Sequence, residues 1–123
     1  SLLAEAPEAV LAELEAYIIP RLPISVLLLG MGEDMHTASI FPGADNVDVA
    51  LDKGAPILVP MRASGAPEPR VTLSARVLND AMSKHLVMTG SSKRAALDRA
   101  QTLPARDAPV RAVLDDMSVH WCK

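Results

Sequence analysis

The chain has 123 residues, a formal net charge of −3 and only three aromatic residues of the Phe, Tyr and Trp types. This balance argues against nucleic-acid binding, which needs a basic surface and often aromatic side chains that stack on bases. The single cysteine, Cys122, excludes an internal disulfide and a cysteine-based zinc site, and it indicates a reducing compartment. The apolar runs are far shorter than the roughly 20 residues that cross a bilayer, so we expect a soluble, cytoplasmic protein without membrane contacts.

Four short apolar runs predict strands at residues 24–29, 56–61, 85–89 and 117–121. They begin about 30 residues apart, the length of a strand, a crossover helix and a parallel return strand. The runs are apolar on both faces, as is typical of parallel strands that lie between two layers of helices. The spacing therefore predicts an α/β fold with a mostly parallel sheet flanked by helices.

Helices are predicted between these strands, at residues 7–19, 74–81, 91–102 and 110–114. The first has apolar side chains at helical spacing and is followed by Pro20, which should end it. Ser74 and Ser91 are placed to cap the next two helices. The Gly- and Pro-containing stretch 62–69 is predicted to be a loop.

The segment that follows the first strand, residues 30–43, carries the residues best suited to chemistry. Ligands of open parallel sheets bind at the carboxyl ends of strands, where this segment should lie. Gly30 and Gly32 permit positive φ and a close backbone approach to a ligand. Asp34 lies two residues before His36, so its carboxylate could orient the imidazole as a base that takes a proton from water.

Other interpretations of the same segment remain open on these residues alone. It could be an ordinary strand-to-helix turn in which Asp34 only caps the chain. Metal binding by Asp34 and His36 lacks a third ligand. A dinucleotide fingerprint is excluded because Met35 stands where its third glycine is needed.

Residues 30–42 resemble the 6-phosphogluconolactonase signature Gly-x-Gly-x-Asp-Gly-His-Thr-Ala-Ser-Leu-Phe-Pro, with Met35 in place of its third glycine. Residues 69–73, 89–93 and 119–121 resemble three later motifs of the same family in the same order. The resemblance implies a Rossmann-like sheet and the C-terminal half of the family's domain, because the family's Ser-Gly-Gly-Ser-Thr-Pro phosphate turn is not found. We therefore expect residues 1–123 to form a single partial α/β domain that is nearly inactive when isolated.

The resemblance also implies roles for individual residues. His36 would be the general base and Asp34 its orienting carboxylate or a structural cap, while backbone amides at Gly30 and Gly32 would bind substrate. Arg70 and Lys93 would bind phosphate. Lys93 is independently placed for this role, because it falls in the first turn of a predicted helix, where free amides attract anions.

Met35 should make a positive φ difficult at its position. Neither a metal nor an organic cofactor is expected, because hydrolysis of an activated ester needs only a base and charge stabilisation. The histidines His85 and His120 lie in predicted strands and are interpreted as hydrogen-bonded structural residues.

The implied function is hydrolysis of 6-phospho-D-glucono-1,5-lactone to 6-phosphogluconate in the oxidative pentose phosphate pathway. The partner would then be a small sugar-phosphate lactone, and the sequence does not predict an oligomeric state. One alternative is a glucosamine-6-phosphate deaminase or isomerase, although residues 37–42 depart from the Ile-Ala-Phe-Asn-Glu that follows the histidine in that group. The other alternative is a catalytically silent module that binds sugar phosphates.

Overall fold

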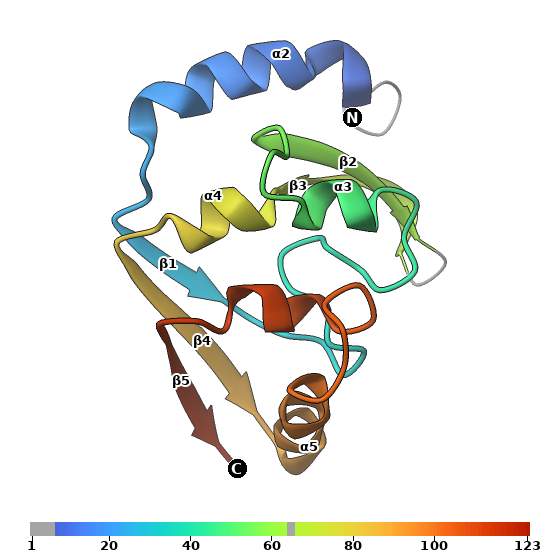
Figure 1. Ribbon diagram of the computed structural model, residues 1–123, viewed down its shortest axis with the longest axis vertical. Helices are drawn as coiled ribbons and strands as arrows, with labels where there is room; N and C mark the ends of the chain where they lie inside the picture. The colour runs from blue at the N-terminus through green and yellow to red at the C-terminus, as the bar shows by residue number, and fades with distance from the viewer. Residues whose placement is uncertain (1–6, 64–65) are drawn as a thin grey trace.

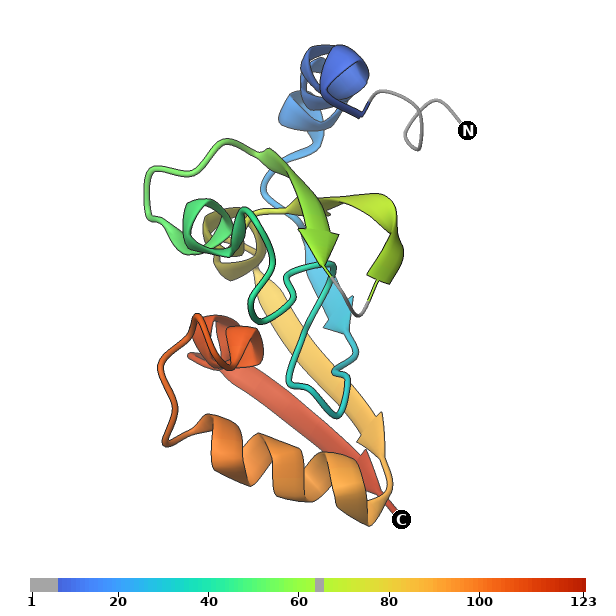
Figure 2. The same cartoon turned by 90° about the vertical axis from the view of Figure 1, so that its right-hand side faces the viewer.

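The computed structural model describes residues 7–63 and 66–123 and is an α/β arrangement of short elements (Figure 1). In chain order these are α2 (Pro7–Ile18), the 3-10 helix η1 (Ile19–Arg21), β1 (Val26–Leu29), α3 (Val47–Leu51), β2 (Leu58–Ala63), β3 (Ala66–Leu73), α4 (Ala75–Asn79), β4 (Ser83–Thr89), α5 (Ser91–Ala100), the 3-10 helix η2 (Pro109–Val113) and β5 (Met117–Cys122). In both views α2 and α5 lie at opposite ends of the molecule (Figures 1 and 2). Among these described helices, none is long and apolar enough to cross a membrane.

The main sheet has three parallel strands in the order β1-β4-β5. Leu28 on β1 pairs with His85 on β4, which in turn pairs with Ser118 on β5. Each of these strands lies within or close to a range predicted from the apolar runs. The expectation of a parallel sheet with helices packed against it is therefore confirmed.

The second predicted strand does not join that sheet. β2 instead pairs antiparallel with β3 in a separate two-stranded sheet, with a register shift between Met61 and Ala63. The prediction that residues 62–69 form a loop is wrong, because β3 begins at Ala66. Two adjacent segments can pair locally without a crossover helix, and a two-stranded ribbon tolerates Pro60 because each of its strands has a free edge.

The helices were predicted more closely than the strand pairing. α2 and α5 begin at the expected residues, and α4 and η2 fall inside or next to their predicted ranges. Ser74 and Ser91 do not cap as expected: the Ser74 side chain makes no capping bond, and the N-cap of α5 is Gly90. The short α3 was not predicted, because five residues are too few to establish a helical periodicity.

One face of the three-stranded sheet forms the core. Leu27, Leu29, Leu86 and Met88 are buried on this face. The covering helices α5 and η2 lie on this side in Figure 2, and their small and aliphatic side chains belong to the same buried cluster. Aliphatic and methionine side chains supply most of this cluster, in agreement with a sequence that has few aromatic residues.

The other face of the sheet is open in the described residues. Val26, Leu28 and Val87 are exposed by 65%, 68% and 45%. β1 therefore alternates between exposed and buried side chains, and the expectation that both faces are buried is not met. An exposed cluster of large aliphatic side chains is a surface that tends to associate with other apolar surfaces.

This alternation generates a prediction for the polypeptide 1–123. Leu28→Ser should reduce self-association while changing the free energy of unfolding by less than about 0.5 kcal/mol, because the side chain is exposed. Leu29→Ser, the matched control on the adjacent residue, should lower the free energy of unfolding by about 2–4 kcal/mol. Sedimentation velocity and urea denaturation measure the two effects. Equal destabilisation by both substitutions would contradict an open face.

Candidate active site

The loop after β1 turns tightly between Gly32 and His36. The Met35 amide donates to the Gly32 carbonyl at 2.9 Å, and the Gly32 amide donates to the His36 carbonyl at 3.1 Å. Thr37 closes the base of this turn, because its hydroxyl donates to the Gly30 carbonyl at 2.8 Å. The turn therefore presents residues 30–36 at the carboxyl end of β1, where the sequence predicted a ligand site.

Asp34 contacts His36 through two hydrogen bonds. The Oδ1 atom of Asp34 lies 2.6 Å from Nδ1 of the imidazole and accepts the His36 backbone amide at 3.1 Å. An ionised carboxylate can only accept, so Nδ1 carries the hydrogen and Nε2 is left to accept a proton. The two side chains, predicted as a pair, are therefore brought together in the geometry of an oriented base.

The pKa of Asp34 is set by two opposing effects. Burial raises it, but the hydrogen bonds and charge of His36 outweigh burial and hold the pKa below the usual value of 3.8. The carboxylate is therefore ionised at neutral pH. Asp34 itself stays half exposed, as expected for a residue at the mouth of a site.

Gly32 is required by the close packing of this pair. A Cβ atom built on Gly32 would lie 2.3 Å from Nδ1 of His36 and 2.7 Å from Oδ1 of Asp34, closer than real contacts allow. Gly30 differs, since a Cβ atom there would meet no atom within 4 Å. Neither glycine uses the positive φ that glycine permits, and Gly32 is instead needed because its backbone lies close to the side chains of His36 and Asp34.

Met35 adopts the left-handed conformation that the sequence appeared to disfavour. Its φ is 71°, so the loop takes the positive φ that the side chain makes difficult. An L-residue held in this region costs about 1–2 kcal/mol relative to its relaxed conformation. The Val110 amide of η2 donates to the Met35 carbonyl at 3.0 Å, and the partly buried side chain packs on the core. These contacts hold Met35 in place despite the strain.

Lys93 and His36 line the same cavity. It measures about 430 Å³ and is also bordered by Gly30, Gly32 and Ala38. Lys93 is half-buried in the first turn of α5, directly after the left-handed Gly90. A cation and a base that are far apart in the sequence are therefore neighbours at the carboxyl ends of β1 and β4.

Arg70 does not line this cavity. It is exposed on β3, and its Cζ atom lies 5.8 Å from the centre of the Phe41 ring. That ring stacks on the imidazole of His36, with 4.4 Å between the ring centres. Phe41 therefore lies between Arg70 and His36, and the hairpin carries Arg70 on a sheet separate from β1 and β4.

The sequence singled out neither Phe41 nor the anchoring role of Thr72 in this site. The Thr72 hydroxyl accepts the Ser39 amide at 3.2 Å and so ties the loop to β3. Phe41 could have been suspected, because it is one of three aromatic residues and lies five positions after His36. Thr72 lies in the motif at residues 69–73, but that motif does not predict its contact, which joins residues that are distant in the chain.

The remaining histidines pair with each other. Nδ1 of His85 lies 2.9 Å from Nε2 of His120, and its other ring nitrogen lies 2.8 Å from the Ser83 hydroxyl. They are hydrogen-bonded, as the sequence interpretation proposed. In the described parts of the chain, no group of three or more His, Cys, Asp or Glu side chains could hold a metal ion.

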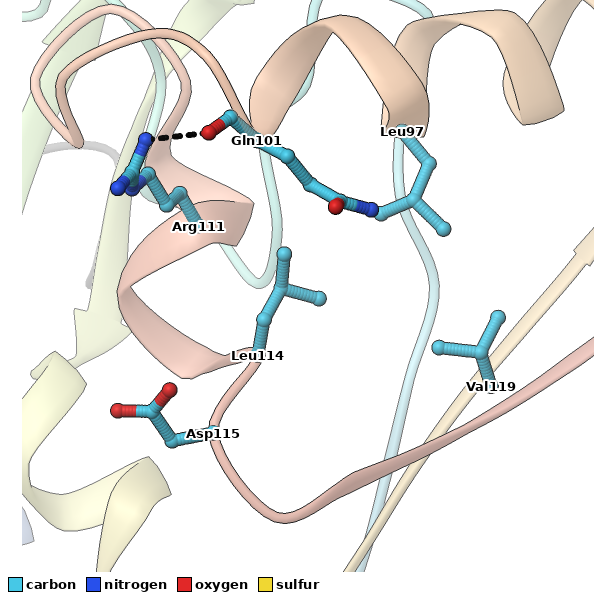
Figure 3. Close-up of a pocket in the computed structure, with 6 residues that line it drawn as sticks. All are labelled: Leu97, Gln101, Arg111, Leu114, Asp115 and Val119. Atoms are coloured by element: carbon cyan, nitrogen blue, oxygen red, sulfur yellow. Dashed lines mark hydrogen bonds between the residues drawn. The ribbon is translucent and has the colours of Figure 1, made fainter.

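A second cavity of about 410 Å³ lies between α5 and β5 (Figure 3). Its arginine, Arg111, donates to the backbone carbonyls of Gln101 and Leu103 at 2.7 and 2.9 Å. Arg111 therefore provides donors for backbone carbonyls just beyond the C-terminal end of α5. None of the predicted site residues lines this cavity.

The chain is similar to known proteins over nearly its full length. A family model described as "Glucosamine-6-phosphate isomerases/6-phosphogluconolactonase" matches residues 2–121. The 6-phosphogluconolactonase of Pseudomonas aeruginosa is 43% identical over 122 residues, covering 97% of this chain and 50% of the relative. That of Mesorhizobium japonicum is 45% identical over 104 residues, covering 80% of this chain and 43% of the relative.

Solved structures agree with these sequence relatives. A 6-phosphogluconolactonase from Shewanella baltica superposes with a TM-score of 0.81 at 29% identity, covering 91% of this chain and 51% of that one. One from Leishmania guyanensis gives a TM-score of 0.70 at 27% identity, covering 93% and 49%. The chain thus spans about half the length of the proteins that it matches.

The Asp34–His36 pair generates a prediction about titration. Because the folded pKa of Asp34 lies below 3.8, its stabilising contribution is complete above that value and is lost as the pH falls through the folded pKa. In His36→Ala the side-chain hydrogen bond and the charge of the imidazole are lost, while burial and the backbone hydrogen bonds remain, so the pKa of Asp34 should rise above its value in the parent. Carbon-13 NMR of the Asp34 carboxyl measures both midpoints. An unchanged titration midpoint of Asp34 in His36→Ala would show that the imidazole does not lower the pKa of this carboxyl.

Proposed function

Because the chain belongs to the family of glucosamine-6-phosphate isomerases and 6-phosphogluconolactonases, we propose that the protein carrying it hydrolyses 6-phospho-D-glucono-1,5-lactone to 6-phosphogluconate. This reaction would place the protein in the oxidative pentose phosphate pathway. The observation that carries the proposal is the cavity shared by His36 and Lys93. The substrate has an ester carbon that needs a base and a phosphate that needs a cation, and this cavity offers both.

His36 would act as the general base. With its Nδ1 hydrogen bonded to Asp34, Nε2 takes a proton from water while the water oxygen adds to the lactone carbonyl. When the tetrahedral intermediate collapses, the bond from the carbonyl carbon to the ring oxygen breaks. The protonated imidazole returns its proton to that oxygen, which gives the carboxylic acid and the free hydroxyl and restores the base.

Phosphate binding is assigned to Lys93 at the start of α5. The free amides of the first turn carry partial positive charge, which an anion complements and an unpaired lysine does not. Arg70 lies farther out on β3, so its role would be a contact at the rim of the site. The substrate would then lie with its phosphate toward α5 and its ester toward the loop after β1.

Stabilisation of the developing oxyanion would come from backbone amides near the cavity. The Gly32 amide is committed to the His36 carbonyl at 3.1 Å, so it is not proposed as a donor. Gly30 borders the cavity and has open space where a Cβ atom would stand, which leaves room for a ligand to approach the backbone. Fixed backbone dipoles are effective here because they need no reorganisation during the reaction.

The isomerase branch of the family is the competing enzyme assignment. The family description covers both activities, but both sequence relatives described above are 6-phosphogluconolactonases. After His36 this chain continues Thr-Ala-Ser-Ile-Phe-Pro, without the acid and amide that ring opening of an amino sugar would use. The lactonase assignment is therefore favoured, and a turnover assay separates it from a silent sugar-phosphate-binding module.

Replacement of His36 tests its role as the general base. In the full-length protein, His36→Ala should lower the rate of lactone hydrolysis above the spontaneous rate by about 10² or more, the usual effect of losing a general base. His120→Ala, which removes another exposed histidine outside the cavity, is the matched control and should stay within about twofold of the parent. Wild-type turnover in His36→Ala would remove this residue from the mechanism.

Replacement of Lys93 or Arg70 separates phosphate binding from the chemical step. Lys93→Ala should raise KM several-fold and lower kcat less, because the phosphate is remote from the reacting carbon but helps to position it. Arg70→Ala should have a smaller effect in the same direction. Arg94→Ala is the control, since it removes a positive charge from the same helix outside this cavity. An unchanged KM in both Lys93→Ala and Arg70→Ala would place the phosphate site elsewhere.

A further inference from the structure

We propose that Phe41 is a positioning residue for the base and also favours the protonated form that the base adopts during turnover. The proposal rests on the proposed function, in which His36 takes a proton from water. It is carried by the stack between the two rings, whose centres are 4.4 Å apart with planes inclined by 25°.

The ring of Phe41 is fixed by its surroundings. Phe41 is only 7% exposed and belongs to the buried core cluster. The chain reaches it through a turn in which the Ile40 amide donates to the Thr37 carbonyl at 2.9 Å. The Ser39 amide in this turn is held by Thr72, so the loop is tied to β3 just before the ring. Phe41 is therefore a rigid surface under the imidazole.

The stack restricts a motion that Asp34 alone leaves free. One hydrogen bond at Nδ1 fixes a single atom of the imidazole, and the ring can still tilt about that contact. A flat surface against one face of the ring opposes this tilt, while Gly32 brings the backbone close to Nδ1. The position of Nε2 is then determined by the loop before any substrate binds.

The stack also has an electrostatic consequence. The face of an aromatic ring carries partial negative charge and attracts a cation placed over it. The charged groups around His36 are Asp34 in its own loop, Arg70 on β3 and Lys93 on α5. The two cations oppose a positive charge on the imidazole, whereas the carboxylate and the Phe41 ring favour it. Removing the ring therefore weakens the base.

The test compares two substitutions of Phe41 in the full-length protein. Phe41→Leu keeps an apolar side chain and removes the flat face, whereas Phe41→Tyr keeps the face. We expect Phe41→Leu to lower kcat about five- to tenfold with KM within twofold. The acid limb of its pH–rate profile should move to lower pH, because the ring face that favours the charged imidazole is gone. Phe41→Tyr should restore both values to within twofold of the parent.

The control for simple destabilisation is Ile40→Val. Ile40 is fully buried beside Phe41, and losing one methylene there lowers stability without altering the ring stack. Its kcat and pH profile should match the parent, with melting temperatures measured for all variants. If Phe41→Leu does not fold, Phe41→Met takes its place, since it is also apolar and lacks a flat face.

Several results would overturn the proposal. These are an unchanged kcat and pH profile in Phe41→Leu, an equal loss in Phe41→Tyr, or the same pH shift in Ile40→Val. The outcome for His36→Ala keeps this failure distinct from failure of the proposed function. If His36→Ala is inactive and Phe41→Leu is normal, only the role of Phe41 is wrong. If His36→Ala is fully active, the assignment of the base itself is wrong.

Discussion

The two hydrogen bonds between Asp34 and His36 constrain the conformation of the loop around them. One carboxylate oxygen accepts from both the imidazole and the backbone amide of the same residue, which is possible only if the chain turns sharply between them. That turn brings the Gly32 carbonyl to the Met35 amide and leaves no space for a side chain at Gly32. It also requires a left-handed residue at Met35. The signature spacing of glycine, aspartate and histidine is therefore a geometric requirement of one hydrogen-bonded pair.

Strain in this loop is concentrated beside the base. Met35 and Ala38 both have positive φ, at 71° and 51°, and they lie on either side of His36 and Thr37. Each conformation is unfavourable by roughly 1–2 kcal/mol for a residue with a side chain. Neighbouring elements compensate, since η2 bonds to the Met35 carbonyl and Thr72 bonds to the amide that follows Ala38. The surrounding fold thus holds His36 in a geometry that the loop alone would not maintain.

The sequence predicted those features that follow from one-dimensional patterns. Apolar runs located β1, β4 and β5, and the rule that ligands bind at the carboxyl ends of parallel strands pointed to the segment that carries His36. Lys93 was predicted from the family resemblance and from its place in the first turn of a helix. The apolar runs did not predict that β2 would pair with β3, because an apolar run does not specify which strand it pairs with. Arg70 lies on this hairpin and does not line the cavity that His36 and Lys93 share, a placement that the sequence pattern does not specify. Phe41 was part of the signature, but its stack on His36 was not predicted, because that contact depends on how the loop folds back.

The order of strands in the main sheet bears on how the site forms during folding. β1 and β4 are neighbours, with Val26 opposite Ser83, although about half of the chain separates them. Closing so long a loop costs entropy before any contact compensates for it, and topologies rich in such pairings fold slowly. The loop after β1 can form its own turn early, but it meets α5 only once β4 has paired. His36 and Lys93 therefore become neighbours only when β1 and β4 are paired, so formation of the cavity depends on a contact between distant parts of the chain.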